Sequence, residues 1–208
     1  IVVFRNEIGV LLHDLFQFRR GESLQYIGLL LLSAIPVGIV GVFFKEDVEA
    51  FFSGNLQLVG SMLLVTAVLL LITRFARGGD KPAGGVQALL IGLAQAVAVL
   101  PGISRSGATI ATGLMLNMEP MRAARFSFLM AIMPILGAAL LEAKDLADDP
   151  ADFHELGLPA LLVGFFTAFL VGMLACRTML HLVKKGNLFY FAFYCALIGT
   201  IALVFGGR

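Results

Sequence analysis

The sequence predicts an all-α fold: a polytopic membrane helical bundle that contains one re-entrant helical hairpin. Apolar residues make up 59% of the 208 positions and charged residues only 14%, whereas about 25% of the residues of a typical soluble domain are charged. Several apolar runs are long enough for spanning helices, which need roughly 20 residues. The net charge of +1 gives no support to a nucleic-acid partner.

Five segments have the composition of spanning helices: 24–44, 56–73, 126–141, 156–176 and 188–205. The third is slightly short, but it lengthens toward its N-terminus if Arg122 and Arg125 extend their charged ends to the interface. Pro36 and Pro134 lie inside spans, which membrane helices tolerate when neighbouring groups satisfy the freed backbone. The opening residues 1–4, followed by Arg5, resemble the last turn of a membrane helix, so we expect an N-terminally truncated chain.

The charges differ between the connections and predict which side each one faces. Two loops, 45–55 and 142–155, hold one basic residue each but nine of the fourteen acidic residues. The remaining four connections are basic. Because basic loops stay in the cytoplasm, we expect a multi-pass membrane protein with its four basic connections inside and its two acidic loops outside.

The segment between the basic residues near 81 and 122 must then begin and end in the cytoplasm. Its second part, 108–118, would be only about 16 Å long as a helix, too short for a hydrocarbon core of about 30 Å. We therefore predict a re-entrant hairpin, with a helix over 85–100, a break at Pro101-Gly102 and a short returning helix. Irregular backbone at that depth is tolerated only where it is buried or lines a wet cavity, so the break indicates a site.

One charged residue, Arg105, lies between Lys81 and Glu119. An arginine at bilayer depth costs about 2.5–3.5 kcal/mol on insertion scales and indicates a function. The alternative is that the loop surfaces and Arg105 only reaches the interface. Arginine binds phosphate oxygens in a bidentate manner, glycines allow close backbone approach, and hydroxyls at a helix start favour anions. These residue types predict an anion cradle formed by Gly102, Ser104, Arg105, Ser106, Gly107 and Thr109.

The predicted cradle lacks other catalytic groups. No carboxylate or histidine is expected at the depth of Arg105, and magnesium or calcium sites require carboxylates, so we assign no metal ligand. Gln95 is the only other strongly polar side chain in the first half of the hairpin, and we include it among the candidate substrate-binding residues. Ser104 is a conceivable nucleophile, but nothing visible would activate it.

The stretch 91–109, which reads IGLAQAVAVLPGISRSGAT, resembles the second signature of bacterial undecaprenyl-diphosphate phosphatases, the bacitracin-resistance protein family. The downstream residues 125–129, with Pro134 and the pair at 137–138, resemble the helix that follows in that family. The resemblance covers essentially the whole chain. It implies an enzyme that removes the terminal phosphate of a C55 isoprenoid diphosphate, recycles the lipid carrier of cell-wall synthesis and confers resistance to bacitracin.

The resemblance also assigns roles to residues. It implies that Arg105 binds the diphosphate, that Ser104 and Thr109 bind phosphate oxygens, and that Ser106 is a weaker candidate; Arg105 and Ser104 are the catalytic candidates. The family's other signature, rich in glutamate with a serine and a histidine, is absent and by the family pattern would precede Ile1. We therefore expect the other catalytic groups and most ligands of a Mg²⁺ or Ca²⁺ cofactor to lie there, and the piece alone to be inactive.

We expect one membrane domain, 1–208, built as an inverted repeat whose first half is incomplete. Residues 1–83 would form the incomplete repeat and residues 84–208 the second, with the hairpin at 84–118. Because such repeats with broken helices are also typical of transporters, an alternative function is a flippase or transporter for polyprenyl phosphate or another anion. A structural membrane subunit is a third alternative, but it leaves Arg105 unexplained.

Glycine pairs in two spans predict close helix packing in lipid. They are Gly38 with Gly41 and Gly164 with Gly172, and one of these faces is also an option for a homodimer. The expected partners are thus the polyprenyl diphosphate substrate, membrane lipids and, as an open alternative, a second copy of the chain.

Overall fold

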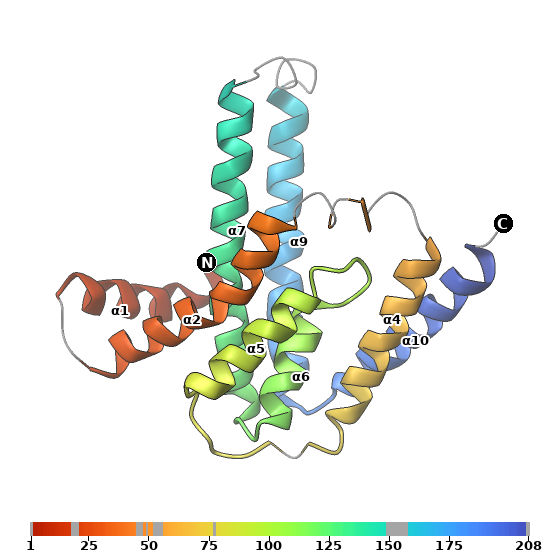
Figure 1. Cartoon of the computed structure of the whole chain (residues 1–208), viewed down its shortest axis with the longest axis horizontal. Helices are drawn as coiled ribbons and strands as arrows, with labels where there is room; N and C mark the ends of the chain where they lie inside the picture. The colour runs from red at the N-terminus through yellow and green to blue at the C-terminus, as the bar shows by residue number, and fades with distance from the viewer. Residues whose placement is uncertain are drawn as a thin grey trace.

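The computed structural model describes residues 2–17, 21–44, 48, 50–51, 56–76, 78–148 and 158–206, and all regular elements in these ranges are helices (Figure 1). The predicted all-α class is confirmed. The elements are η1 (Val2–Phe4), α1 (Arg5–Phe16), α2 (Glu22–Phe43), α4 (Leu56–Ile72), α5 (Gly85–Val97), α6 (Arg105–Met115), α7 (Pro120–Asp148), α9 (Leu158–Lys184) and α10 (Leu188–Phe205).

Four of the described helices, α2, α7, α9 and α10, are long and apolar enough to cross a membrane. The α4 helix is equally apolar but has 17 residues, which is about the lower limit for a span. Pro36 and Pro134 lie inside α2 and α7, as predicted. The chain is therefore a polytopic membrane protein.

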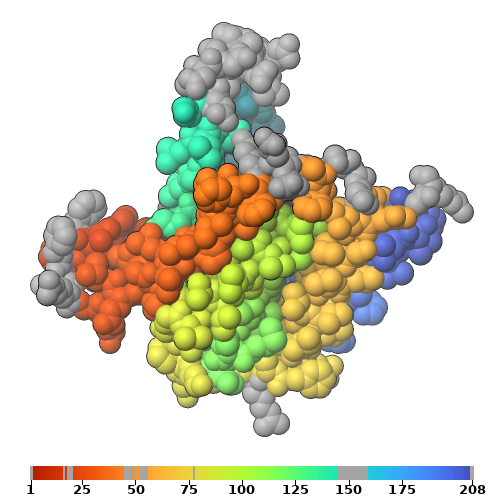
Figure 2. Space-filling view, in the orientation of Figure 1, coloured from red at the N-terminus to blue at the C-terminus, as the bar shows by residue number. Residues whose placement is uncertain are grey.

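The hairpin of α5 and α6 occupies the centre of the molecule (Figure 1). The α2 helix packs on α5 from one side and α4 contacts α6 from the other, while α7 contacts α2, α6 and α9. The α10 helix pairs along its length with α4, and the far ends of α7 and α9 extend beyond the rest (Figure 1). On the face shown in Figure 2, α5 is visible between α2 and α4.

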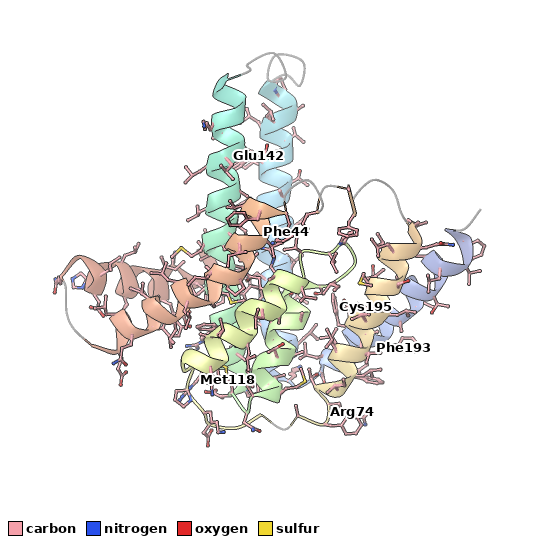
Figure 3. The ribbon with its side chains drawn as sticks, in the orientation of Figure 1. Phe44, Arg74, Met118, Glu142, Phe193 and Cys195 are labelled. Atoms are coloured by element: carbon pink, nitrogen blue, oxygen red, sulfur yellow. The ribbon has the colours of Figure 1, made fainter. Side chains whose placement is uncertain are left out.

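Both ends of the hairpin lie together, as the re-entrant prediction requires. The backbone N–H of Gly79 donates to the carbonyl of Met118 at 3.4 Å, and that of Lys81 donates to the carbonyl of Asn117 at 3.2 Å. Figure 3 shows Met118 and Arg74 toward one end of the bundle and Phe44 toward the other. The segment from 81 to 119 therefore enters and leaves at the same end.

The boundaries of the hairpin helices differ from the prediction. The first helix ends at Val97 instead of residue 100, and the second begins at Arg105 instead of 108. The earlier start follows from a cap, because the Ser104 side chain accepts a hydrogen bond from the N–H of Gly107 and so ends the break before Arg105.

One further predicted boundary was wrong, and one helix was not predicted. The α7 helix continues to Asp148, so the first half of the predicted acidic loop 142–155 is helical; no glycine or proline interrupts residues 138–148. The rest of that loop, like most of the loop 45–55, lies outside the described residues. Before the first span, residues 5–16 form the unpredicted helix α1, which is joined to α7 by an ion pair between Glu7 and Arg125 at 3.1 Å.

The glycine prediction was also wrong within this chain. A methyl group built on Gly38, Gly41, Gly164 or Gly172 would meet nothing within 4 Å. Close packing occurs instead between α4 and α10, where a Cβ on Gly199 would lie 2.9 Å from the carbonyl oxygen of Gly60. The absence of side chains at these two positions lets the two helices approach closely.

We expect Gly199→Leu to destabilise the protein by about 1–3 kcal/mol, because the new side chain must separate α4 from α10. Thermal unfolding in detergent, followed by circular dichroism, measures the effect. Gly38→Leu is the matched control, because the same side chain enters open space there. Equal unfolding temperatures for the two variants would contradict the assigned packing.

Candidate functional site

The break between α5 and α6 is shaped by one glycine. Gly102 has a φ of +96°, a conformation that glycine adopts far more readily than other residues. A Cβ at this position would lie 2.4 Å from the carbonyl oxygen of Val59 and 2.9 Å from the Cβ of Met62. The backbone of the break therefore lies directly against α4.

The side chain of Thr66, in α4, holds the break by hydrogen bonds to its backbone. Its hydroxyl shares its hydrogen between two carbonyl oxygens, that of Gly102 across the helix contact and that of Met62 in its own helix, both at 3.1 Å. The same oxygen accepts from the backbone N–H of Ser104 at 3.0 Å. Thr66 is 1% exposed, so these bonds are protected from water. The sequence analysis missed this residue. The sequence does show Thr66 as a hydroxyl residue within an apolar span, but Ser61 in the same span has this property too.

The start of α6 presents free backbone donors. Ser104 caps the helix, since its Oγ accepts from the N–H of Gly107 at 3.2 Å and its carbonyl accepts from the N–H of Ala108 at 2.8 Å. The preceding N–H groups, those of Arg105 and Ser106, have no acceptor among the described residues. Unbonded N–H groups and the positive end of the helix dipole form a binding site for an anion.

Arg105 adds a full positive charge to this helix start. It is half-buried, and in the described part of the chain no carboxylate forms an ion pair with its guanidinium. The other arginines on the adjoining helix α7 are paired, Arg122 with Glu119 at 2.9 Å and Arg125 with Glu7. Arg105 is therefore available to bind an external anion.

Thr109, whose predicted contact with phosphate stays a prediction, is bonded within the protein. It is 1% exposed, its hydroxyl donates to the carbonyl of Arg105 at 2.8 Å, and it shares a short hydrogen bond with the hydroxyl of Ser127 in α7. The side chain thus joins the first turn of α6 to α7. Ser106 is half-buried and lines a cavity between α6 and α9.

Gln95 is the most unusual buried group near the break. Its side chain is 0% exposed, and neither its Nε2 nor its Oε1 has a hydrogen-bond partner among the described residues. An unsatisfied buried polar group costs about 1–3 kcal/mol and calls for an explanation such as a functional role. The predicted role of Gln95 in substrate binding is consistent with this burial and stays a prediction.

A divalent cation does not fit the described residues. They contain no group of three or more His, Cys, Asp or Glu that could hold a metal ion. The cradle offers N–H and O–H donors, which suit an anion, whereas Mg²⁺ and Ca²⁺ require several oxygen ligands, usually including carboxylates. No chemical step through a metal is therefore derived from these residues.

Comparison with known families agrees with this geometry. Residues 1–201 match the profile of the family described as "Bacitracin resistance protein BacA". The chain belongs to this family. The resemblance stated from the residues at the break is thereby confirmed.

Three relatives of the chain are named undecaprenyl-diphosphatase. The chain is 47% identical to the undecaprenyl-diphosphatase of Bacteroides fragilis over 205 residues, which cover 98% of this chain and 77% of that protein. It is 45% identical to the undecaprenyl-diphosphatase of Bacteroides thetaiotaomicron, with 98% and 78% covered. Undecaprenyl-diphosphatase 1 of Bacillus cereus is 38% identical over 213 residues, with 99% and 78% covered.

We expect Thr66→Val to lower the free energy of unfolding by about 1–3 kcal/mol, because it leaves the Gly102 carbonyl and the Ser104 N–H without a partner. It should also reduce the rate of phosphate release, since the start of α6 loses its anchor. Thr66→Ser should restore both. Thr200→Val is the control, because the Thr200 hydroxyl donates only to Ala196 of its own helix.

We expect Gln95→Leu to raise the unfolding temperature, because it removes two unsatisfied polar atoms and fills a similar volume. If Gln95 serves the site, the same substitution lowers the rate of phosphate release, a combination common at functional positions. Both quantities are measured on the same purified variant. A more stable variant with full activity would remove Gln95 from the site.

Proposed function

We propose that this protein hydrolyses undecaprenyl diphosphate to undecaprenyl phosphate and inorganic phosphate. The observation that carries the proposal is Arg105 at the start of α6, which has no ion-pair partner among the described residues and lies beside two backbone N–H groups that none of those residues accepts from. A half-buried cation of this kind within an apolar bundle suits the anionic head of a lipid diphosphate. The names of the relatives support the same reaction.

In the proposed complex the Arg105 guanidinium binds two diphosphate oxygens in a bidentate manner. The N–H groups of Arg105 and Ser106 bind a further oxygen at the helix start. In hydrolysis, the oxygen of water joins the terminal phosphorus, the bond from that phosphorus to the bridging oxygen breaks, and the lipid monophosphate leaves. Fixed donors stabilise the negative charge that develops on the phosphate oxygens during this step.

Ser104 serves this scheme by positioning the cradle. Its Oγ already accepts from the N–H of Gly107, and no acceptor or base among the described residues is bonded to it. We therefore propose that the group that activates the attacking water, and the ligands of a Mg²⁺ or Ca²⁺ cofactor, come from outside the described residues. The glutamate-rich motif expected from the family resemblance has the side chains for both tasks.

The location of the protein and its partners are also part of the proposal. We propose the bacterial inner membrane as its location, on the basis of the charge pattern of its connections. The substrate and the surrounding lipids are the proposed partners. A homodimer stays a prediction, and light scattering of the detergent-solubilised protein measures its mass.

A transporter or flippase is the alternative, and no observation on the described residues favours it over hydrolysis. The assay separates the two, because transport requires no bond cleavage. Since the chain covers 77% of the length of its Bacteroides fragilis relative, phosphate release is measured on this chain and on the chain extended to that length. Each is tested with Mg²⁺, with Ca²⁺ and with a chelator. Absence of lipid diphosphate cleavage in the extended protein would reject hydrolysis.

We expect Arg105→Ala in the extended protein to reduce phosphate release by about 100-fold or more, the effect of removing a preorganised donor from a developing charge. Arg105→Lys should recover only part of the rate, because an ammonium group cannot bind in a bidentate manner. Arg177→Ala, on the exposed side of α9, is the control and should leave the rate unchanged. Near-normal activity of Arg105→Ala in a folded protein would overturn the site.

A further inference from the structure

A cavity of about 560 Å³ lies between α6, α7, α9 and α10. Its lining includes Ser106, which belongs to the cradle, Phe128 of α7 and Phe191 of α10. Its size lies within the range of about 300–1,000 Å³ for small-molecule pockets. The proposed phosphate contacts do not occupy this cavity, although Ser106 in its lining is next to Arg105 in the sequence.

One stripe of α9 forms the long wall of the cavity. The lining residues Val171, Ala175, Met179 and Leu182 recur every three or four positions, which places them on one face of a helix. At 1.5 Å per residue this stripe is about 16 Å long. Except for a few small polar groups such as the Ser106 hydroxyl, the wall is apolar.

The exposure of the lining residues changes along the stripe. Met179 is 9% exposed, whereas Val171 and Leu174 are 60% and 68% exposed. The cavity is therefore deep beside Met179 and open beside Val171, on a helix that is long and apolar enough to cross a membrane. An apolar ligand can thus occupy the deep part while its remainder passes into the surrounding lipid.

We propose that this cavity binds the isoprene units next to the diphosphate, and that the rest of the chain leaves between Val171 and Leu174 into the bilayer. The inference rests on the proposed function and adds where the apolar part of the substrate lies. Two observations carry it: Ser106 belongs both to the cradle and to the lining of the cavity, and most of the other lining residues are apolar, with the Thr178 hydroxyl bonded to the carbonyl of Leu174 in its own helix. A ligand with an anionic head and an apolar tail satisfies both.

Gly172 provides a way to fill the cavity without disturbing the helix. It lines the cavity, and a Cβ on it would meet nothing within 4 Å. In the extended protein, Gly172→Leu should lower kcat/KM for farnesyl diphosphate by about tenfold or more, the usual effect of an obstructed apolar pocket. The value for isopentenyl diphosphate, which has a single isoprene unit, should change less than about twofold by the same reasoning.

Gly164→Leu is the matched control. Gly164 lies on the same helix, is equally exposed and has open space around its Cβ, but it does not line the cavity. It should leave both substrates unaffected. If Gly172→Leu lowers kcat/KM equally for both substrates, or for neither, the proposed position of the chain is wrong.

A second readout does not depend on hydrolysis. Cys176 is partly exposed and lines the cavity, whereas Cys195 is 2% exposed and serves as the internal reference. Farnesyl diphosphate should slow the alkylation of Cys176 by a maleimide, and inorganic pyrophosphate should not. Equal alkylation rates with and without farnesyl diphosphate would overturn the inference. Protection of Cys176 without any phosphate release from the extended protein would instead reject the proposed hydrolysis and retain the binding site.

Discussion

The hydroxyl of Thr66 connects the two sides of the break in the hairpin. By donating to the carbonyl of Gly102 and accepting from the N–H of Ser104, it satisfies backbone groups that would otherwise be unpaired in an apolar bundle. Ser104 can then cap α6, and the cap determines where that helix begins. Arg105 and the free N–H groups take their positions from this start, so the geometry of the site depends on a side chain of another helix.

Close helix packing supports that arrangement from outside. The Gly60–Gly199 contact joins α4 to α10, so the wall against which the break lies is a pair of helices rather than one. On the opposite side, α5 approaches α2 so closely that a Cβ on Gly92 would lie 2.3 Å from the carbonyl oxygen of Ser33. The hairpin is therefore held between α2, at Gly92, and α4, at Gly102, and close packing on both sides limits its movement.

Two kinds of polar group near the break have no partner among the residues that the structure describes. Arg105 and the first N–H groups of α6 suit an external anion, whereas the fully buried amide of Gln95 is unsatisfied on both its polar atoms. Such groups reduce stability, and proteins retain them where they serve binding or catalysis. The apolar cavity that starts at Ser106 gives the same site an environment for a hydrocarbon chain. Head and tail of a lipid diphosphate thus find complementary surfaces on adjoining parts of α6 and α9.

The helical membrane class, the hairpin and Arg105 as the cation at its break could be predicted from the sequence, because long apolar runs and a single charge within a long apolar stretch are local properties of the chain. Helix ends were predicted less well, since the cap at Ser104 and the uninterrupted residues 138–148 outweigh hydropathy. Only the tertiary structure distinguished Thr66, which holds the break, from Ser61, whose hydroxyl donates to Gln57 of its own helix. It also decided which glycines pack and that the Thr109 hydroxyl bonds Ser127. These outcomes depend on which helix faces which, and that is set by contacts between residues far apart in the chain.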